Sequence, residues 1–337
     1  MSEEQKIDWT SGEIGNLWNI YMANSMSSCM FKHFLLNCED EEIKDCLVTA
    51  DQLSKDILSH LKEMFQQEGM AVPMGFSLEG DVNESAPRLF SDSFYLNYLE
   101  MMVKYGALYY SVALPGFSKM DLRQSITDIN ISSLNLSNKV TEMMLNKGLH
   151  VRAPSIPKMK EVTFVEKQSF FNGYYGDKRP LSAMEITHLY LNIQVNAIKT
   201  ILVMGFSQVA KDAEVRNYFL RGKKINIKQH NTLSQIMYKE DLPVSIPSQF
   251  MITESTEAPY SDKLMLFHIS NLSSAKVRNF GDSIAVSPRH DLGATYARFL
   301  LETANFAEDG GNIQIENEWM ERQPGNVDRN QLAKEKK

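Results

Sequence analysis

The sequence predicts an all-α protein made of two tandem four-helix bundles. Three observations support this: the chain repeats itself, its apolar residues follow helical spacing, and helix-capping residues precede the apolar segments. Residues 11–14 (Ser-Gly-Glu-Ile) align with 183–186 (Ala-Met-Glu-Ile) at an offset of 172 residues. Further along, the pair Ser-Asp at 91–92 aligns with the same pair at 261–262, at an offset of 170. Two copies of one helical unit therefore fill the chain.

Each copy reads as four helices with a long connection between the second and the third. In the first copy we expect them near 11–36, 40–67, 91–114 and 119–147. In the second copy, Ser182 and Glu185 form a capping-box pattern that begins a helix over about 182–207. Helices over 212–239 and 261–285 follow, and a fourth begins near 288 and runs past 306. Short turns and one long connection are typical of a four-helix bundle with one crossover.

These helices divide the chain into an N-terminal bundle (1–150), a connector (151–177) and a C-terminal bundle (178–325). The connector contains the aromatic run Phe-Phe-Asn-Gly-Tyr-Tyr at 170–175, so we expect it to be packed rather than solvated. Each bundle is long enough to bury a core of its own.

Composition narrows the classes of function. The net charge of −7 argues against nonspecific binding to nucleic acid. The three cysteines lie in the first copy without a C-x-x-C pair, and we expect them to be reduced thiols. The polar N-terminus does not resemble a signal peptide, and we found no apolar run of the roughly 18 residues that a membrane span needs. We therefore expect a cytoplasmic protein without membrane contact. A homo-oligomer is compatible with the sequence, and a small-molecule substrate is not identified.

Histidines distinguish the second copy from the first. His188, His230 and His268 stand where the first copy has Asn16, Leu58 and Tyr98. His188 and His230 lie equally far from a turn near residue 209. If the next connection folds straight back, His268 reaches the same height, because helices rise about 1.5 Å per residue. The spacing therefore predicts three imidazoles in one layer of the C-terminal bundle.

Carboxylates could complete a metal site in this layer. The fourth helix offers Glu302, and Asp309, about two turns further on, is the alternative if the calculated height is off by one or two turns. Glu185 lies one turn before His188. Imidazoles and carboxylates on facing helices suit transition metals, so we expect one or two ions of Fe, Mn or Zn.

Each of these residues also has a purely structural interpretation. A single histidine on an apolar helix face is most often a core or boundary residue. Glu185 is equally explained as a capping-box residue, because Glu13 recurs in the first copy where no histidine follows. Glu302 becomes a surface residue if its helix is rotated by about 60°, since neighbouring positions on a helix face differ by such angles.

Several strings resemble an uncharacterised tandem-repeat family of Bacillus-type bacteria. They are residues 184–189 (MEITHL), 204–210 (MGFSQVA), 260–265 (YSDKLM) and 308–313 (EDGGNI). The resemblance covers nearly the whole chain. It implies two ferritin-like four-helix bundles and, in some members, a bound metal, but no reaction.

Two functions follow from these patterns. The first is a metal-binding helical protein with an iron- or manganese-type redox or oxygen-handling site in the C-terminal bundle. The second is a non-catalytic structural or interaction protein, associated with stress or with spores, whose metal is structural or absent. The sequence does not decide whether the protein is an enzyme.

Overall fold

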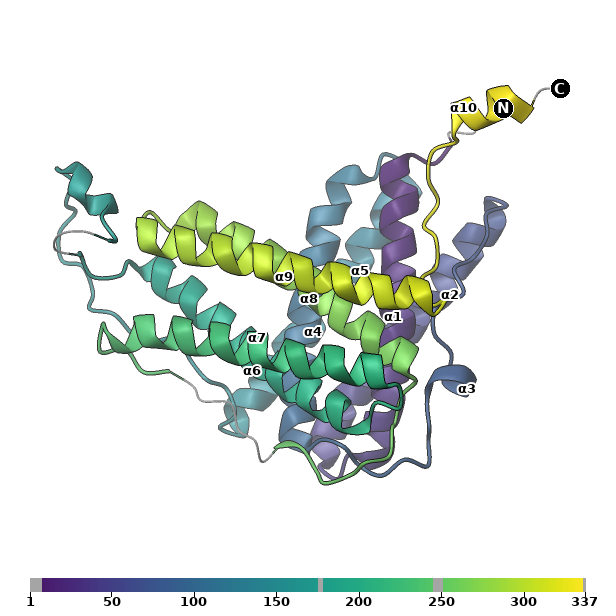
Figure 1. Ribbon diagram of the computed structural model, residues 1–337, viewed down its shortest axis with the longest axis horizontal. Helices are drawn as coiled ribbons and strands as arrows, with labels where there is room; N and C mark the ends of the chain where they lie inside the picture. Colours follow the sequence, from purple (N-terminus) through teal and green to yellow (C-terminus); the bar gives the residue numbers. More distant parts are fainter. Residues whose placement is uncertain (1–7, 175–177, 245–250, 336–337) are drawn as a thin grey trace.

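The computed structural model describes residues 8–174, 178–244 and 251–335, and its long helices form two halves that cross each other (Figure 1). The N-terminal half consists of α1 (Ser11–Asn37), α2 (Glu41–Gln67), α4 (Asp92–Ala113) and α5 (Met120–Asn146), with the short α3 (Leu78–Asp81) and η1 (Leu114–Gly116). The C-terminal half consists of α6 (Ala183–Val209), α7 (Ala213–Tyr238), α8 (Asp262–Val286) and α9 (His290–Glu316). The one-turn η2 (Gln168–Phe171) precedes it, and α10 (Arg329–Glu335) follows it.

The predicted repeat is confirmed helix by helix. α6 begins at 183 and α1 at 11, which is the offset of 172, and α8 begins at 262 and α4 at 92, which is the offset of 170. All-α architecture with two tandem helical domains is thus correct. The finer assignment to the ferritin-like type stays a prediction.

Capping explains why the helices begin where the sequence predicts. The Thr10 hydroxyl accepts a hydrogen bond from the Glu13 amide, and the Glu13 carboxylate accepts one from the Thr10 amide. Ser182 and Glu185 form the same reciprocal pair at the start of α6. Such a box satisfies backbone N–H groups that a helix start leaves without partners.

The two halves share part of their core. One apolar cluster contains Phe34 and Tyr98 from the N-terminal half together with Phe206 and Leu264 from the C-terminal half. Separate clusters occupy the far end of each half, around Phe65 in one and Phe299 in the other. Because the shared cluster is continuous, the halves cannot separate without exposing apolar surface to water.

The contact between the halves has a local two-fold character. The backbone N–H of Asn83 donates to the Pro259 carbonyl at 2.9 Å, and the backbone N–H of Thr253 donates to the Leu89 carbonyl at 2.9 Å. Residues 83 and 253 are equivalent at the offset of 170, and so are 89 and 259. The connection between α2 and α4 and the connection between α7 and α8 thus donate the same backbone hydrogen bond to each other.

The connector differs from its prediction. Phe170 packs under the Arg179 guanidinium at 4.1 Å from the ring centre, as a packed connector requires. However, Val162 and Phe164 are 84% and 88% exposed, and Tyr174 is 60% exposed. No helix passes over this stretch of the described chain to cover it, so the connector is mostly solvated.

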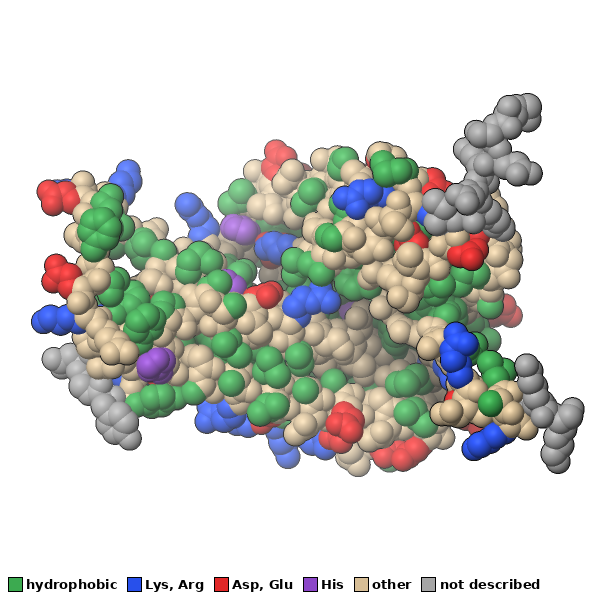
Figure 2. Space-filling view, turned by 90° about the horizontal axis from the view of Figure 1, so that it is seen from above, with side chains coloured by type: hydrophobic (Ala, Val, Ile, Leu, Met, Phe, Trp, Pro, Cys, Tyr) green, Lys and Arg blue, Asp and Glu red, His purple; other side chains and the backbone are tan. Residues whose placement is uncertain are grey.

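Among the described residues, one helix is long and apolar enough to cross a membrane by length and composition, namely α6, with a mean hydropathy of 1.3 over 18 residues. The sequence-based search missed it because Lys199 interrupts the apolar run. Of that window, 72% is buried inside the molecule, which is how the central helix of a packed bundle also appears. On the face seen in Figure 2, side chains of both charges are scattered between apolar ones.

Candidate functional site

The three histidines do not meet in one layer. His188 Nδ1 lies 3.1 Å from the Ser283 hydroxyl, and His230 Nδ1 lies 3.4 Å from the Ile193 carbonyl. Burial lowers the pKa of both imidazoles, so both favour the neutral form. In the described part of the chain, no three His, Cys, Asp or Glu side chains are placed to hold a metal ion. The structure therefore does not bring the predicted ligands together, and both the ligand set and the bound metal stay predictions.

His268 explains why the layer fails. Its Nε2 lies 3.0 Å from the Tyr98 hydroxyl of the N-terminal half, and both residues are fully buried. Burial, together with the nearby Lys199, lowers the pKa of His268 to about 3. The height calculation assumed that His268 points into its own bundle. It points instead across the contact between the halves.

Glu185 caps the start of α6 and links it to Arg179 and Arg289. The Arg179 guanidinium donates to both of its carboxylate oxygens at 2.7 and 2.8 Å, and the Arg289 amide donates to one of them at 3.1 Å. Burial opposes ionisation, but these hydrogen bonds outweigh it and lower the pKa. The repeat supports this interpretation, because Glu13 accepts the Lys119 amide in the same way at 2.9 Å. Of its two predicted roles, the capping role is the one formed.

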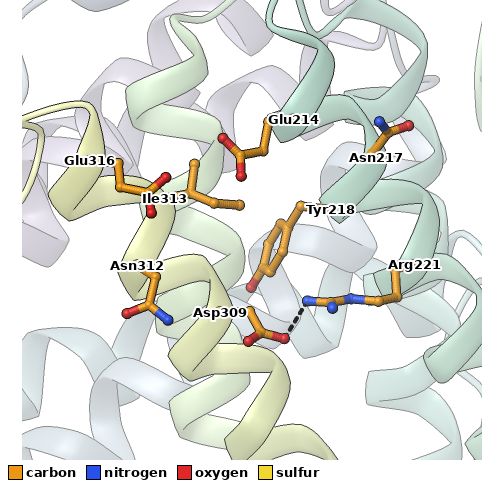
Figure 3. A pocket seen from close by; sticks show the side chains of 8 residues that line it. All are labelled: Glu214, Asn217, Tyr218, Arg221, Asp309, Asn312, Ile313 and Glu316. Carbon is orange, nitrogen blue, oxygen red and sulfur yellow. Dashed lines mark hydrogen bonds and ion pairs between the residues drawn. The ribbon is translucent and has the colours of Figure 1, made fainter.

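Glu302 and Asp309 lie apart from the histidines. Glu302 is paired with Lys228, and its carboxylate accepts a hydrogen bond from the side-chain amide of Gln229 at 2.9 Å. Asp309 is half exposed and forms an ion pair with Arg221 at 2.6 Å. Figure 3 shows this pair in a surface pocket of about 400 Å³, where Asp309 points toward Arg221. Both carboxylates therefore connect α7 with α9, Asp309 at the surface and Glu302 in a partly buried position.

Two buried lysines occupy the centre of the C-terminal half. The Lys276 amine donates to the Asn196 and Asn226 side-chain oxygens at 2.5 and 2.9 Å. The Lys199 amine donates to the Ser273 hydroxyl at 2.6 Å. Both lysines are 1% exposed. Burial lowers the pKa of Lys199 to about 7 and holds that of Lys276 well below its ordinary value, because a charged amine without a carboxylate partner is unfavourable in an apolar interior.

The N-terminal half has a cavity at the equivalent place. At the offsets of the repeat, Ser27 stands for Lys199 and Gly106 for Lys276. Both line a cavity of about 530 Å³. Its inner wall also contains the counterparts of the residues that bind the two amines, namely Asn24, Ser54 and Val103. The two lysine side chains that fill the C-terminal core are thus replaced in the N-terminal core by a short serine side chain and by the hydrogen atom of a glycine.

Polar groups without partners face this cavity. The hydroxyls of Ser27, Ser54 and Ser133 receive no hydrogen-bond partner from the part of the chain that the structure describes, although each residue is 9% exposed or less. Beside these serines and Asn24, the inner wall has apolar side chains such as Ile20, Ile57 and Val103. Buried hydroxyls are normally paired, so the cavity has polar positions that a bound molecule or water would satisfy.

The mouth of the cavity is built from both halves. α8 contributes Phe267 and Arg278, and the segment after α9 contributes Trp319 and Glu321. Glu321 holds this segment in place, because its carboxylate accepts the Gly75 and Met74 amides at 2.6 and 2.9 Å. The C-terminal half therefore closes one side of a cavity whose inner end belongs to the N-terminal half.

The cavity is not among the sites predicted from sequence, because those predictions rest on histidines rather than on side-chain volume. The signal was nevertheless present in the repeat. Lys199 interrupts an apolar helix, and its counterpart is the small Ser27. The long Lys276 likewise has Gly106 as its counterpart. Two large-to-small differences on neighbouring helices indicate unfilled space in the first copy.

Comparisons with known proteins give a family and no activity. No curated protein matches the chain. A solved structure from Bacillus halodurans C-125, titled a "putative spore coat protein", is similar over 44% of this chain and 98% of its own, with 13% identity and a TM-score of 0.42. That likeness is too weak to transfer any property. The family described as "Protein of unknown function (DUF3231)" matches residues 2–162 and again residues 169–332. The chain belongs to this DUF3231 family, and it contains two tandem copies of the family's domain.

Proposed function

We propose that this is a non-catalytic binding protein. Its N-terminal half binds a small, largely apolar molecule in the cavity, and its C-terminal half has a structural role. The observation that carries this proposal is the difference between equivalent cores, since Lys199 and Lys276 fill one while Ser27 and Gly106 leave the other open.

The size and character of the cavity support a binding role. Its volume of about 530 Å³ falls within the range of small-molecule sites, about 300–1,000 Å³. Ligand sites usually combine apolar walls with a few placed polar groups, as here. Burying apolar ligand surface contributes roughly 25 cal/mol per Å², so an apolar body supplies most of the affinity.

The contacts of the residues that were predicted as ligands of a redox metal favour a non-catalytic role. His230 and His268 contact a carbonyl and a hydroxyl in the interior. Glu185 holds a helix start. These contacts give each of the three residues a structural role that requires no reaction.

The test is binding of the neutral fluorescent probe N-phenyl-1-naphthylamine to the full-length protein. Gly106→Met should weaken binding at least tenfold, because the new side chain enters the cavity where only the Tyr110 ring stands within 4 Å of an added Cβ. The variant should remain folded, since glycine disfavours a helix by about 1 kcal/mol.

Gly281→Met is the matched control. Gly281 also lies in a helix, nothing stands within 4 Å of an added Cβ, and it does not line the cavity. It should gain the same helix propensity and bind the probe like the native protein. If Gly106→Met is folded and binds the probe unchanged, the cavity is not the binding site and the proposal fails.

A further inference from the structure

We infer that the ligand of the N-terminal cavity is an aliphatic molecule with one neutral hydrogen-bond donor, a primary alcohol being the simplest case, and that Asn24 and Ser54 bind this donor. This inference rests on the proposed function and adds the chemical class of the ligand. It follows from what the second copy places at the same position.

The C-terminal half shows what this arrangement of helices accepts. Lys276 carries a four-carbon chain that ends in an amine, and the amine donates to Asn196 and Asn226. At the offsets of the repeat, these two residues correspond to Asn24 and Ser54. The aliphatic chain has no counterpart, because residue 106 is glycine. A ligand with an aliphatic chain and a terminal donor would restore the missing group.

The acceptor has the same orientation in both copies. The Asn196 amide nitrogen donates to the Asn192 carbonyl one turn earlier at 2.8 Å, which leaves its oxygen to Lys276. The Asn24 amide nitrogen donates to the Ile20 carbonyl one turn earlier at 2.8 Å and to the Tyr110 hydroxyl at 3.2 Å. Its oxygen is therefore the free end of the amide, and no donor from the described residues bonds to it.

A second polar group lies on the next helix. Ser54 on α2 is 5% exposed and lines the cavity, and none of the described residues gives its hydroxyl a partner. In the C-terminal half, the residue at this position is the second acceptor for the amine. A ligand hydroxyl between Asn24 and Ser54 could donate to the amide oxygen and accept from the serine.

The positions of the charged side chains that line the cavity favour a neutral hydrogen-bond donor in the ligand over a charged one. The charged side chains that line the cavity are Arg278 on α8 and Glu321 after α9, both at the mouth, and the lining tyrosines are Tyr105, Tyr109 and Tyr110. Among the described residues, no carboxylate lines the cavity beside Asn24 and Ser54. Asp51, one turn before Ser54 on α2, is paired with Lys55 and accepts the Ser28 hydroxyl instead. An ammonium group beside Asn24 and Ser54 would lose its hydration without an ionic partner, and a carboxylate would meet an acceptor. A hydroxyl avoids both costs.

The test compares four molecules of equal chain length by calorimetry with the full-length protein. They are 1-octanol, heptyl methyl ether, n-octylamine and octanoate. At pH 7 we expect 1-octanol to bind about tenfold more tightly than the ether, which accepts but cannot donate a hydrogen bond. Octanoate and the protonated amine should bind more weakly than the ether.

Ser54→Ala removes the second polar group. It should weaken the binding of 1-octanol and of the ether about fivefold each, because the oxygen of either molecule can accept from the serine. Ser132→Ala is the control, because Ser132 lies on α5 next to the lining residue Ser133 and is exposed; it should leave both affinities unchanged. Equal affinities for the alcohol and the ether, or a Ser54→Ala variant that binds both like the native protein, would overturn the inference while the proposed function stands. If none of the four binds, the proposed function fails with it.

Discussion

Tyr98 and His268 occupy equivalent positions in the two repeats and form a hydrogen bond to each other, with Oη and Nε2 3.0 Å apart. A local two-fold axis passes close to this contact, because Asn83–Pro259 and Thr253–Leu89 are exchanged across it. A strictly symmetric pair would place two tyrosines or two histidines here. The substitution in one copy provides an unlike pair at the point where the halves meet.

Tyr98→Phe should destabilise the protein by about 1–3 kcal/mol, because it leaves the buried His268 Nε2 without a partner. His268 Nδ1 already has none among the described residues. Urea unfolding measures the change. The double variant Tyr98→Phe with His268→Leu removes both polar groups and should cost less than the sum of the single variants. Strict additivity would show that the contact contributes nothing.

The two buried lysines should respond differently to replacement by methionine. Lys199→Met leaves Ser273 with a partner, since its hydroxyl still donates to the Ile269 carbonyl at 2.7 Å. We expect it to stabilise the protein by about 1–3 kcal/mol at pH 7, because a buried polar group is removed. Lys276→Met leaves the oxygens of Asn196 and Asn226 unpaired and should destabilise it by about 1–3 kcal/mol. Equal effects of the two changes in urea unfolding would contradict this account.

Stability should rise with pH between about 7 and 8. Burial lowers the pKa of Lys199 from 10.5 to about 7 in the folded protein. Between these values the unfolded chain holds the Lys199 proton and the folded protein does not, so this group makes the free energy of unfolding increase with pH. Above about pH 8.5 the buried thiols of Cys29, Cys38 and Cys46 oppose this increase, because burial raises their pKa in the folded protein. Lys276 adds to the same trend, since burial lowers its pKa too. Urea unfolding at several pH values should show a smaller slope in Lys199→Met than in the native protein.

Removal of metal should leave the fold unchanged. His230 contacts the Ile193 carbonyl at 3.4 Å, and Leu58 stands at this position in the first copy. We therefore expect dialysis against a chelator to leave the melting temperature unaltered, and His230→Leu to be neutral or slightly stabilising with unchanged metal content. Elemental analysis checks the second point. Loss of a stoichiometric metal in His230→Leu would restore the histidine site predicted from sequence.

Much of the fold could be predicted from sequence because its causes are local. Ser182 and Glu185 fix a helix start through residues three positions apart, and the offset carries this to Thr10 and Glu13. The histidine site could not be predicted, because the direction of His268 depends on how the second half packs on Tyr98. The cavity is an intermediate case. The repeat shows that Gly106 is the counterpart of Lys276. This difference indicates a cavity only once both positions are known to face a core.

The central claim is that equivalent cores are open in one half and filled in the other. Xenon enters apolar cavities, so anomalous diffraction from crystals under xenon pressure tests it most directly. The account predicts a xenon atom beside Ile20, Ile57 and Val103 and none between Lys199 and Lys276. Xenon in the C-terminal core, or its absence from the N-terminal cavity, would contradict the account.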